Sequence, residues 1–372
     1  MKKLEFGPSK CHSIHIGKHK TCYPLKAHET VIKEKDSAVY LGDTILNTGS
    51  NNKTIESRRN LGIGAISQIF SLVEEKSFGH FYFDILSILR DSVLVSKLVF
   101  NSEIWYNLTK DNIRKLEEID EIFWRKAYEV CRSVAKESLY IISGKMPLMY
   151  IILKRRLLYW WHLCHVKEDE LIRKVYSVQC ATVQKSDWVY TLKQDCESLN
   201  IQISDEQVAC MSKSKFKNYI ESKIMNKASI FLNNLKDSHS KSKYLPKFNG
   251  KPDAFLLSKK LSKDEKIVLY KLKTRMINVA GNFPSSKQTK WCKLCFVCYD
   301  QQEHLINCFV IRKQLENKVD FSLQYCDIEG PLARQENLAK IYTVILSTRE
   351  EILKDNSPNG DQALEDRSLP LP

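Results

Sequence analysis

The stretch from residue 291 to residue 308 reads Trp291-Cys-Lys-Leu-Cys-Phe-Val-Cys-Tyr-Asp-Gln-Gln-Glu-His-Leu-Ile-Asn-Cys308. It contains Cys292, Cys295, His304 and Cys308 at the spacing Cys-x2-Cys-x8-His-x3-Cys. Thiolates two residues apart can bind one ion from a tight turn, and a His and a Cys four positions apart point from the same face of a short helix. The pattern predicts one structural Zn²⁺, because four protein ligands leave no position for a reactive water.

Two alternatives to this zinc site remain open. The chain has 12 cysteines, so a few of them could lie close together in the sequence by chance. Cys298 lies inside the same loop and could replace Cys295 as a ligand, or it could be a spare thiol. The spacing alone does not choose between these possibilities.

The basic residues of the chain are concentrated in the segment that precedes this stretch. The net charge of the chain is +14, and between Ala209 and Arg275 there are 17 Lys or Arg against five acids, a balance of +12. From Glu350 onward six acids face only two basic residues. A basic segment beside a zinc site favours a polyanionic partner, RNA and/or DNA first. The alternative is a solvated, lysine-rich helix face that binds nothing.

Length and composition exclude several classes of protein. With 372 residues, 43% of them hydrophobic, the chain can bury the cores of two or three compact units. The first residues contain no apolar leader, and no run of about 18 uncharged apolar residues occurs, which argues against a membrane partner. The cysteines outside the one cluster suggest no disulfide framework. We therefore expect an intracellular protein, nuclear or cytoplasmic.

The spacing of apolar residues predicts short strands followed by many helices. Residues 11–16 alternate with period two, 30–32 and 38–41 are further short β-prone runs, and a helical period begins at about residue 51. A turn is expected at Phe6–Ser9, a flexible polar link at 238–243 and a disordered tail from 354. Helices are expected at 51–78, 83–100, 110–132, 148–165, 168–179, 186–199, 213–236, 261–279 and 338–353.

Several stretches occur in the order found in one family of enzymes. The first are Lys3-Leu-Glu-Phe-Gly-Pro-Ser-Lys-Cys-His-Ser-Ile-His-Ile16 and Val39-Tyr-Leu-Gly-Asp-Thr-Ile45. They are followed by Arg58-Arg-Asn-Leu-Gly-Ile-Gly-Ala65, by Leu98-Val-Phe-Asn-Ser-Glu-Ile-Trp-Tyr106 and by the Cys-Cys-His-Cys loop with Glu303-His-Leu305. On these motifs, roughly residues 1 to 350 resemble the C-terminal part of the reverse transcriptases of non-LTR, LINE-type retrotransposons.

The resemblance implies a mainly α fold with a small β remnant at the N-terminus. Residues 1–48 would be the end of the polymerase palm, and residues 49–180 a thumb-like helical bundle. Residues 181–280 would form a basic helical connection, residues 281–350 a zinc-knuckle-like module and residues 351–372 a disordered acidic tail. These boundaries follow from the order of the matching motifs and from the change in charge along the chain.

The resemblance also implies a catalytic group that the chain does not contain. Polymerases hold two Mg²⁺ with carboxylates, one ion activating the primer hydroxyl and the other neutralising the leaving group. The family supplies two of these carboxylates as an adjacent Asp-Asp pair, and no such pair occurs in this sequence. We expect no catalytic residues, no Mg²⁺ held by this chain and no polymerase activity. The expected function is that of a truncated reverse transcriptase, related to RNA-directed DNA polymerases, that retains nucleic-acid binding.

Basic side chains of the thumb-like and connecting helices are the candidates for contacts to phosphate, which position nucleic acid without reading its sequence. They are Arg58, Arg59, Lys154, Arg155, Arg156, Lys213, Lys215, Lys217, Lys271, Lys273 and Arg275. The aromatic run Tyr159-Trp-Trp-His162 could stack on bases. Adjacent tryptophans cannot both face one way on a helix, however, which favours core positions for both.

Two further interpretations remain open. A helical bundle derived from a retroelement could serve as a scaffold that binds protein partners through apolar surface. The chain could also be a fragment of an intact polymerase, mis-started at Met1, whose partners would be the missing palm and fingers. The sequence does not separate these from a nucleic-acid-binding remnant.

Overall fold

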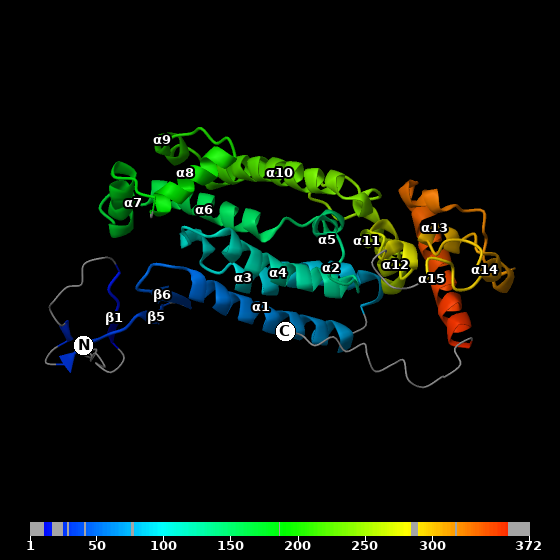
Figure 1. The fold of residues 1–372 in the computed structure, drawn as a ribbon. Helices are drawn as coiled ribbons and strands as arrows, with labels where there is room; N and C mark the ends of the chain where they lie inside the picture. The colour runs from blue at the N-terminus through cyan, green and yellow to red at the C-terminus, as the bar shows by residue number, and fades with distance from the viewer. Residues whose placement is uncertain are drawn as a thin grey trace. The chain divides into compact units, whose positions relative to one another are not determined.

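The computed structural model describes residues 11–16, 25–27, 30–40, 42–75, 78–185, 187–283, 289–316 and 318–355. Helices dominate it, and its few strands are short and lie before residue 47 (Figure 1). The strands are β1 (His12–Ser13), β2 (Lys26–Ala27), β3 (Thr30–Val31), β4 (Lys33–Glu34), β5 (Ser37–Tyr40) and β6 (Asp43–Leu46). The mainly α fold with a small β segment, expected from the sequence, is confirmed.

The described helices agree closely with most of the predicted ranges, and α6 matches its range to the residue. They are α1 (Asn52–Glu75), α2 (Tyr82–Leu89), α3 (Ser96–Leu98), α4 (Lys110–Ala127), α5 (Lys136–Ser143), α6 (Leu148–His165), α7 (Leu171–Ala181), α8 (Trp188–Ser198), α9 (Asp205–Ala209), α10 (Lys213–Ser238), α11 (Ala254–Leu257), α12 (Lys263–Lys273), α13 (Gln302–Leu305), α14 (Phe309–Gln314) and α15 (Leu332–Asp355). No described helix combines the length and the apolarity that crossing a membrane requires.

The strands form three separate two-stranded ladders. β1 pairs with β4 in parallel, and β2 with β3 and β5 with β6 pair antiparallel. The β5–β6 hairpin is fixed to α1 because the buried Arg58 guanidinium donates to the carboxylate of Asp43 at 2.5 Å and to the Gly42 carbonyl at 2.9 Å. The turn expected at Phe6–Ser9 lies outside the described residues.

The chain divides into two compact units assembled from alternating segments. The first unit comprises Met1–Leu72, Ile88–Phe123 and Met146–Ile230, and the second comprises Val73–Ser87, Trp124–Lys145 and Phe231–Pro372. The helices α1, α2, α4 and α10 contribute residues to both units. Sequence periodicity places helices along the chain but carries no information about this grouping, which depends on contacts between distant segments.

Aromatic contacts join helices of the first unit in pairs. In Figure 1, α1 lies beside α4 and α6 lies beside α10. The rings of Phe70 and Phe123 meet at 5.5 Å between α1 and α4, and Trp160 of α6 meets Phe216 of α10 edge-on at 5.8 Å. These residues belong to apolar stripes at three- and four-residue spacing, so each helix buries one face and leaves the opposite face polar.

The second unit is built around α12 and α15. Tyr270 of α12 stacks on Tyr128 at 3.8 Å, and its hydroxyl lies 2.8 Å from that of Ser138 in α5. The Tyr342 hydroxyl of α15 donates to the Gln302 carbonyl at 2.7 Å. Through this contact and others described below, α15 supports the Cys-rich segment.

The structure differs from the sequence-based expectation at several positions, among them the short helix α5 and the link at 238–243. The short helix α5 was not predicted, because Gly144 and Pro147 mark a break but give no signal for a helix before it. The link at 238–243 was expected to be flexible, and that prediction is wrong. The His239 ring and the Ser242 hydroxyl both bond the buried Glu137 carboxylate, at 2.7 and 2.6 Å. The expected disordered tail falls, beyond Asp355, outside the described residues.

Candidate metal centre

The first two cysteines of the Cys-Cys-His-Cys pattern belong to a short β-hairpin of the second unit. An antiparallel bridge between Trp291 and Tyr299 joins its arms, next to a 2.8 Å hydrogen bond from the Cys292 N–H to the Cys298 carbonyl. The chain reverses at Phe296, whose N–H donates to the Cys292 carbonyl at 2.9 Å and whose φ is +55°. This left-handed residue lets the turn close tightly enough to bring the two cysteine sulfurs together.

His304 and Cys308 approach the hairpin from the helical segment that follows it. The prediction that both lie on one short helix is wrong, because His304 belongs to α13, whereas Cys308 precedes the first residue of α14. Between them the chain makes a turn, in which the Asn307 N–H donates to the His304 carbonyl at 2.8 Å. Cys308 has an extended backbone, with ψ of 120°, and this directs its side chain back toward the hairpin.

The four ligand atoms have the separations that a tetrahedral metal site requires. They all lie within 4.8 Å of one another. The sulfurs of Cys292 and Cys308 are 4.0 Å apart, and the Cys295 sulfur is 3.3 Å from Nε2 of His304. Tetrahedral zinc with its usual bond lengths separates two sulfurs by about 3.8 Å and a sulfur from a nitrogen by about 3.5 Å. The cluster can therefore hold one metal ion with little movement.

Burial and hydrogen bonding prepare two of these thiols to bind a cation. Cys292 and Cys308 are fully buried. A hydrogen bond from the Cys308 thiol lowers the pKa of Cys292 to about 4, with further help from backbone amides at Cys295 and Leu294. The same bond raises the pKa of Cys308. A thiol and a thiolate that lie this close together can bind a metal ion in place of the proton.

The residues between the hairpin and α13 fix the module to the core of the second unit. The buried Asp300 carboxylate accepts two hydrogen bonds from one Arg349 nitrogen, at 2.9 and 3.0 Å, and one from the Ala280 N–H at 3.0 Å. The buried Gln302 amide donates to the Leu272 carbonyl at 2.9 Å. These bonds attach both sides of the ligand set to the core of the second unit.

The structure decides between the two candidate thiols of the loop. Cys295 is buried and belongs to the cluster, whereas Cys298 is exposed and its sulfur lies outside the cluster. Cys298 contributes its backbone carbonyl to the hairpin instead. Among the described residues, this is the single group of three or more Cys, His, Asp or Glu side chains that could hold a metal ion.

Three of the predicted phosphate-binding residues are buried and ion-paired, which corrects their assignment. Arg58 pairs with Asp43 as described above, and Arg156 pairs with Asp195 and donates to the Trp105 carbonyl at 2.7 Å. Lys273 pairs with Asp253 at 2.8 Å. The sequence suggested phosphate contacts for these basic side chains, and it gave no sign of their acidic partners, which are 15, 39 and 20 residues away. Their charges are already neutralised inside the protein, so we assign them structural roles.

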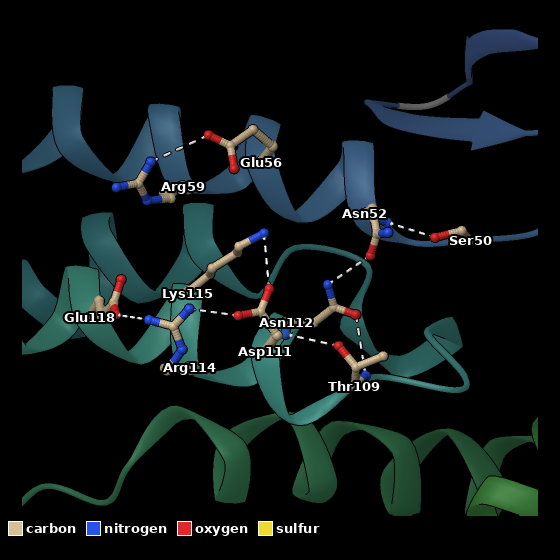
Figure 2. Close-up of polar contacts among 10 residues, drawn as sticks. All are labelled: Ser50, Asn52, Glu56, Arg59, Thr109, Asp111, Asn112, Arg114, Lys115 and Glu118. Atoms are coloured by element: carbon tan, nitrogen blue, oxygen red, sulfur yellow. Dashed lines mark hydrogen bonds and ion pairs between the residues drawn. The ribbon is translucent and has the colours of Figure 1, made fainter.

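Other candidates are partly exposed but engaged by acids. Figure 2 shows Arg59 reaching Glu56 on the same helix, at 3.3 Å, on the surface formed by α1 and α4. Arg155 bonds Glu103 at 3.0 Å, and Arg275 bonds Glu303 at 2.5 Å. Lys271 is half-buried, and burial lowers its pKa. Surface pairs of this kind contribute little stability, so Arg59, Arg155 and Arg275 remain candidates for phosphate contacts.

The lysines at the start of α10 are the most accessible of the candidates. Lys213, Lys215 and Lys217 are all exposed, and the first turn of α10 contains no acid. Lys154 of the facing helix α6 bonds Glu221 at 2.5 Å, and Lys217 lies 4.0 Å from the same carboxylate. These four lysines and one acid form a surface that we call the α10 basic strip.

The aromatic run next to the strip is mostly structural. Trp160 is buried, as expected, and its indole donates to Asp205 at 2.8 Å. Trp161 is only half-buried, so the expectation of a core position holds for it in part. One face of Trp161 stacks on His165, at 3.9 Å, and the ammonium of Lys213 lies 5.9 Å from its ring centroid.

Sequence reasoning missed the contacts that support and extend the metal site. The Asp300–Arg349 pair and the stacked rings of Trp291 and Tyr299 were not expected. The ring pair had a signal, since the two aromatics lie at equal distances from the hairpin turn. The ion pair had none, because its members are 49 residues apart. Comparisons of the chain with protein-family models, with curated proteins and with solved structures found no match.

Proposed function

We propose that this chain is a nucleic-acid-binding protein related to non-LTR reverse transcriptases, with a thumb-like helical first unit and a zinc-knuckle-like module. Zinc is the proposed metal because three thiolates and one imidazole in tetrahedral positions are its preferred ligands. Within this proposal the four ligands stabilise the module, and RNA or DNA binds at the exposed basic surfaces. The palm and fingers of a polymerase stay predicted partners.

The observation that carries the proposal is the position of the α10 basic strip. Lys213, Lys215 and Lys217 lie at the positive end of a 26-residue helix dipole, where each lysine costs stability instead of adding it. Two weak contacts, from Lys213 to the Trp161 ring at 5.9 Å and from Lys217 to Glu221 at 4.0 Å, offset only part of this cost. Helix N-termini and lysines together attract phosphate groups, so an anionic polymer is the ligand that this arrangement suits.

The strip makes a quantitative prediction for binding. We expect the wild-type chain to bind a 30-nucleotide RNA with an affinity that falls steeply as salt rises, because phosphate contacts release counterions. Changing Lys213, Lys215 and Lys217 together to glutamine should reduce the slope of log K against log salt by about 0.7 to 0.9 per lost contact. Fluorescence anisotropy between low and moderate salt measures this slope.

A matched variant distinguishes the effect of the α10 basic strip from the effect of a lower net charge. Lys33→Gln, Lys110→Gln and Lys318→Gln remove the same charge from exposed positions outside the strip, and this variant should keep nearly the wild-type slope. The strip variant should fold at least as well as the wild type, because it removes lysines from a helix N-terminus. A salt-independent wild type, or equal losses in both variants, would contradict the proposal.

A second candidate function, protein docking, rests on α7 in the first unit. Leu171, Val175 and Val178 form an exposed apolar face beside a pocket of about 310 Å³, lined in part by Tyr176 and Trp188. If this face binds a second copy of the chain, Val175→Glu should abolish self-association measured by sedimentation and leave RNA affinity unchanged. A monomeric wild type would exclude this form of docking.

A further inference from the structure

The hairpin of the metal module carries a stacked pair of aromatic rings on its surface. The rings of Trp291 and Tyr299 are nearly parallel, with 6° between their planes and 4.9 Å between their centroids. They are still 48% and 56% exposed. At the tip of the hairpin, Phe296 is 75% exposed and Val297 is also exposed. Large apolar side chains gathered on so small an element cost solvation energy and suggest a ligand.

The ring pair is held in place by bonds on both sides. The two aromatic residues form a cross-strand pair, and the next bond along the ladder runs from the Asp300 N–H to the Lys290 carbonyl at 2.8 Å. One arm of the hairpin carries the metal ligand Cys292, and the other ends at Asp300, which Arg349 anchors. A flat surface fixed in this way binds without the entropy cost of ordering it.

The charges of the hairpin favour a polyanion. Lys290 and Lys293 are exposed and flank Trp291 in the sequence. The single acid between residues 289 and 301 is Asp300, which is buried and paired with Arg349. The exposed surface of the hairpin is thus aromatic and positively charged. That combination fits a ligand with flat apolar rings joined by phosphates better than it fits the mixed surface of a protein.

We propose that the hairpin 289–301 binds unpaired bases of single-stranded nucleic acid, with Trp291 and Tyr299 as the stacking surface and Lys290 and Lys293 near the phosphates. The proposal rests on the proposed nucleic-acid binding and names the form of nucleic acid that this module takes. Bases in a duplex are covered on both faces by their neighbours, so an exposed ring can stack only on an unpaired base.

The test compares a single strand with a duplex on the full, zinc-loaded chain. Fluorescein-labelled 12-nucleotide oligouridine and an RNA duplex of equal length are titrated at one salt concentration. Trp291→Ala and Tyr299→Ala should each weaken binding to the single strand by about fivefold to a hundredfold, the range expected for one lost base–ring stack. Duplex affinity should change by less than about twofold, because the α10 basic strip is untouched.

Three controls make the result specific. Trp291→Phe and Tyr299→Phe keep a flat ring and should retain most of the single-strand affinity. Tyr40→Ala removes an aromatic ring from β5 that is even more exposed, at 64%, and should have no effect on either ligand. Metal content measured for every variant shows whether the module is intact, since an unfolded hairpin would also lose its ion.

The outcomes separate this proposal from the one it rests on. If the wild type binds RNA, two results would overturn the stacking role and leave the proposed function standing. The alanine variants could lose affinity equally for the single strand and the duplex, or they could keep the wild-type affinity for the single strand. Alanine variants with unchanged single-strand affinity would also point to a protein as the partner of the exposed rings. A wild type that binds neither ligand overturns both proposals.

Discussion

Cys308→Ser is expected to remove the metal ion and to unfold the segment from about residue 289 to residue 316. Cys308 is a fully buried ligand and joins α14 to the hairpin. Structural zinc sites of this ligand type supply roughly 10 to 16 kcal/mol of binding free energy in isolated peptides, and a serine hydroxyl does not replace a thiolate on zinc. Elemental analysis should give one zinc per wild-type chain and none in the variant.

The exposed thiol of the same hairpin provides a matched control. Cys298→Ser makes the same chemical change six residues before His304, outside the ligand cluster. We expect this variant to keep one zinc per chain and wild-type resistance to limited proteolysis, whereas Cys308→Ser should be cleaved within 289–316. Equal metal loss in both variants would show that Cys298 is a ligand. Resistance to cleavage in a metal-free Cys308→Ser protein would show that the module folds without the ion.

Asp120→Asn is expected to destabilise the first unit by about 3 to 5 kcal/mol. Arg90 and Asp120 are both buried, and their side chains form two hydrogen bonds, at 2.7 and 2.6 Å. Arg90 begins a π-helical segment, Arg90–Val95, that links α2 to α3. Asparagine has the size of aspartate but no charge, so it leaves the buried guanidinium with only the half-exposed Asp91 as a counterion. Urea denaturation followed by circular dichroism measures the change.

The second acid beside Arg90 tests whether burial is the cause. Asp91 bonds Arg90 at 2.8 Å from a position that is 50% exposed, and Asp91→Asn should cost less than about 1 kcal/mol. A double variant, Arg90→Met with Asp120→Leu, should recover much of the lost stability, because it removes both buried charges. Similar losses for Asp91→Asn and Asp120→Asn would contradict the assignment of the effect to the buried pair.

The prediction that Cys292, Cys295, His304 and Cys308 come together is confirmed, because the four residues are close together in the chain. Cys292 and Cys295 span one turn, and His304 and Cys308 span another, so residue spacing nearly fixes their geometry. The choice between Cys295 and Cys298 was different. It depends on the left-handed turn at Phe296 and on which thiol faces α13, and neither is encoded in spacing.

The prediction of the phosphate-binding residues was less successful because a basic residue in the sequence does not show whether its side chain will be buried. Arg58, Arg156 and Lys273 are indistinguishable in sequence from Lys213 and its neighbours on α10. Each of the three is buried against an acid supplied by another element. A burial pattern along one helix cannot reveal such a partner, and the desolvated pair forms only when the helices pack.

The sequence by itself determined the helical period, the small β segment before residue 47, the basic segment and the grouping of four potential metal ligands, since each depends on residues within a few turns of one another. Tertiary structure alone decided the two interleaved units, the burial of three of the basic side chains, and the anchoring of Asp300 by Arg349. Those features join residues far apart in the chain, and the free energy that selects them comes from packing and desolvation between elements, which local sequence does not specify.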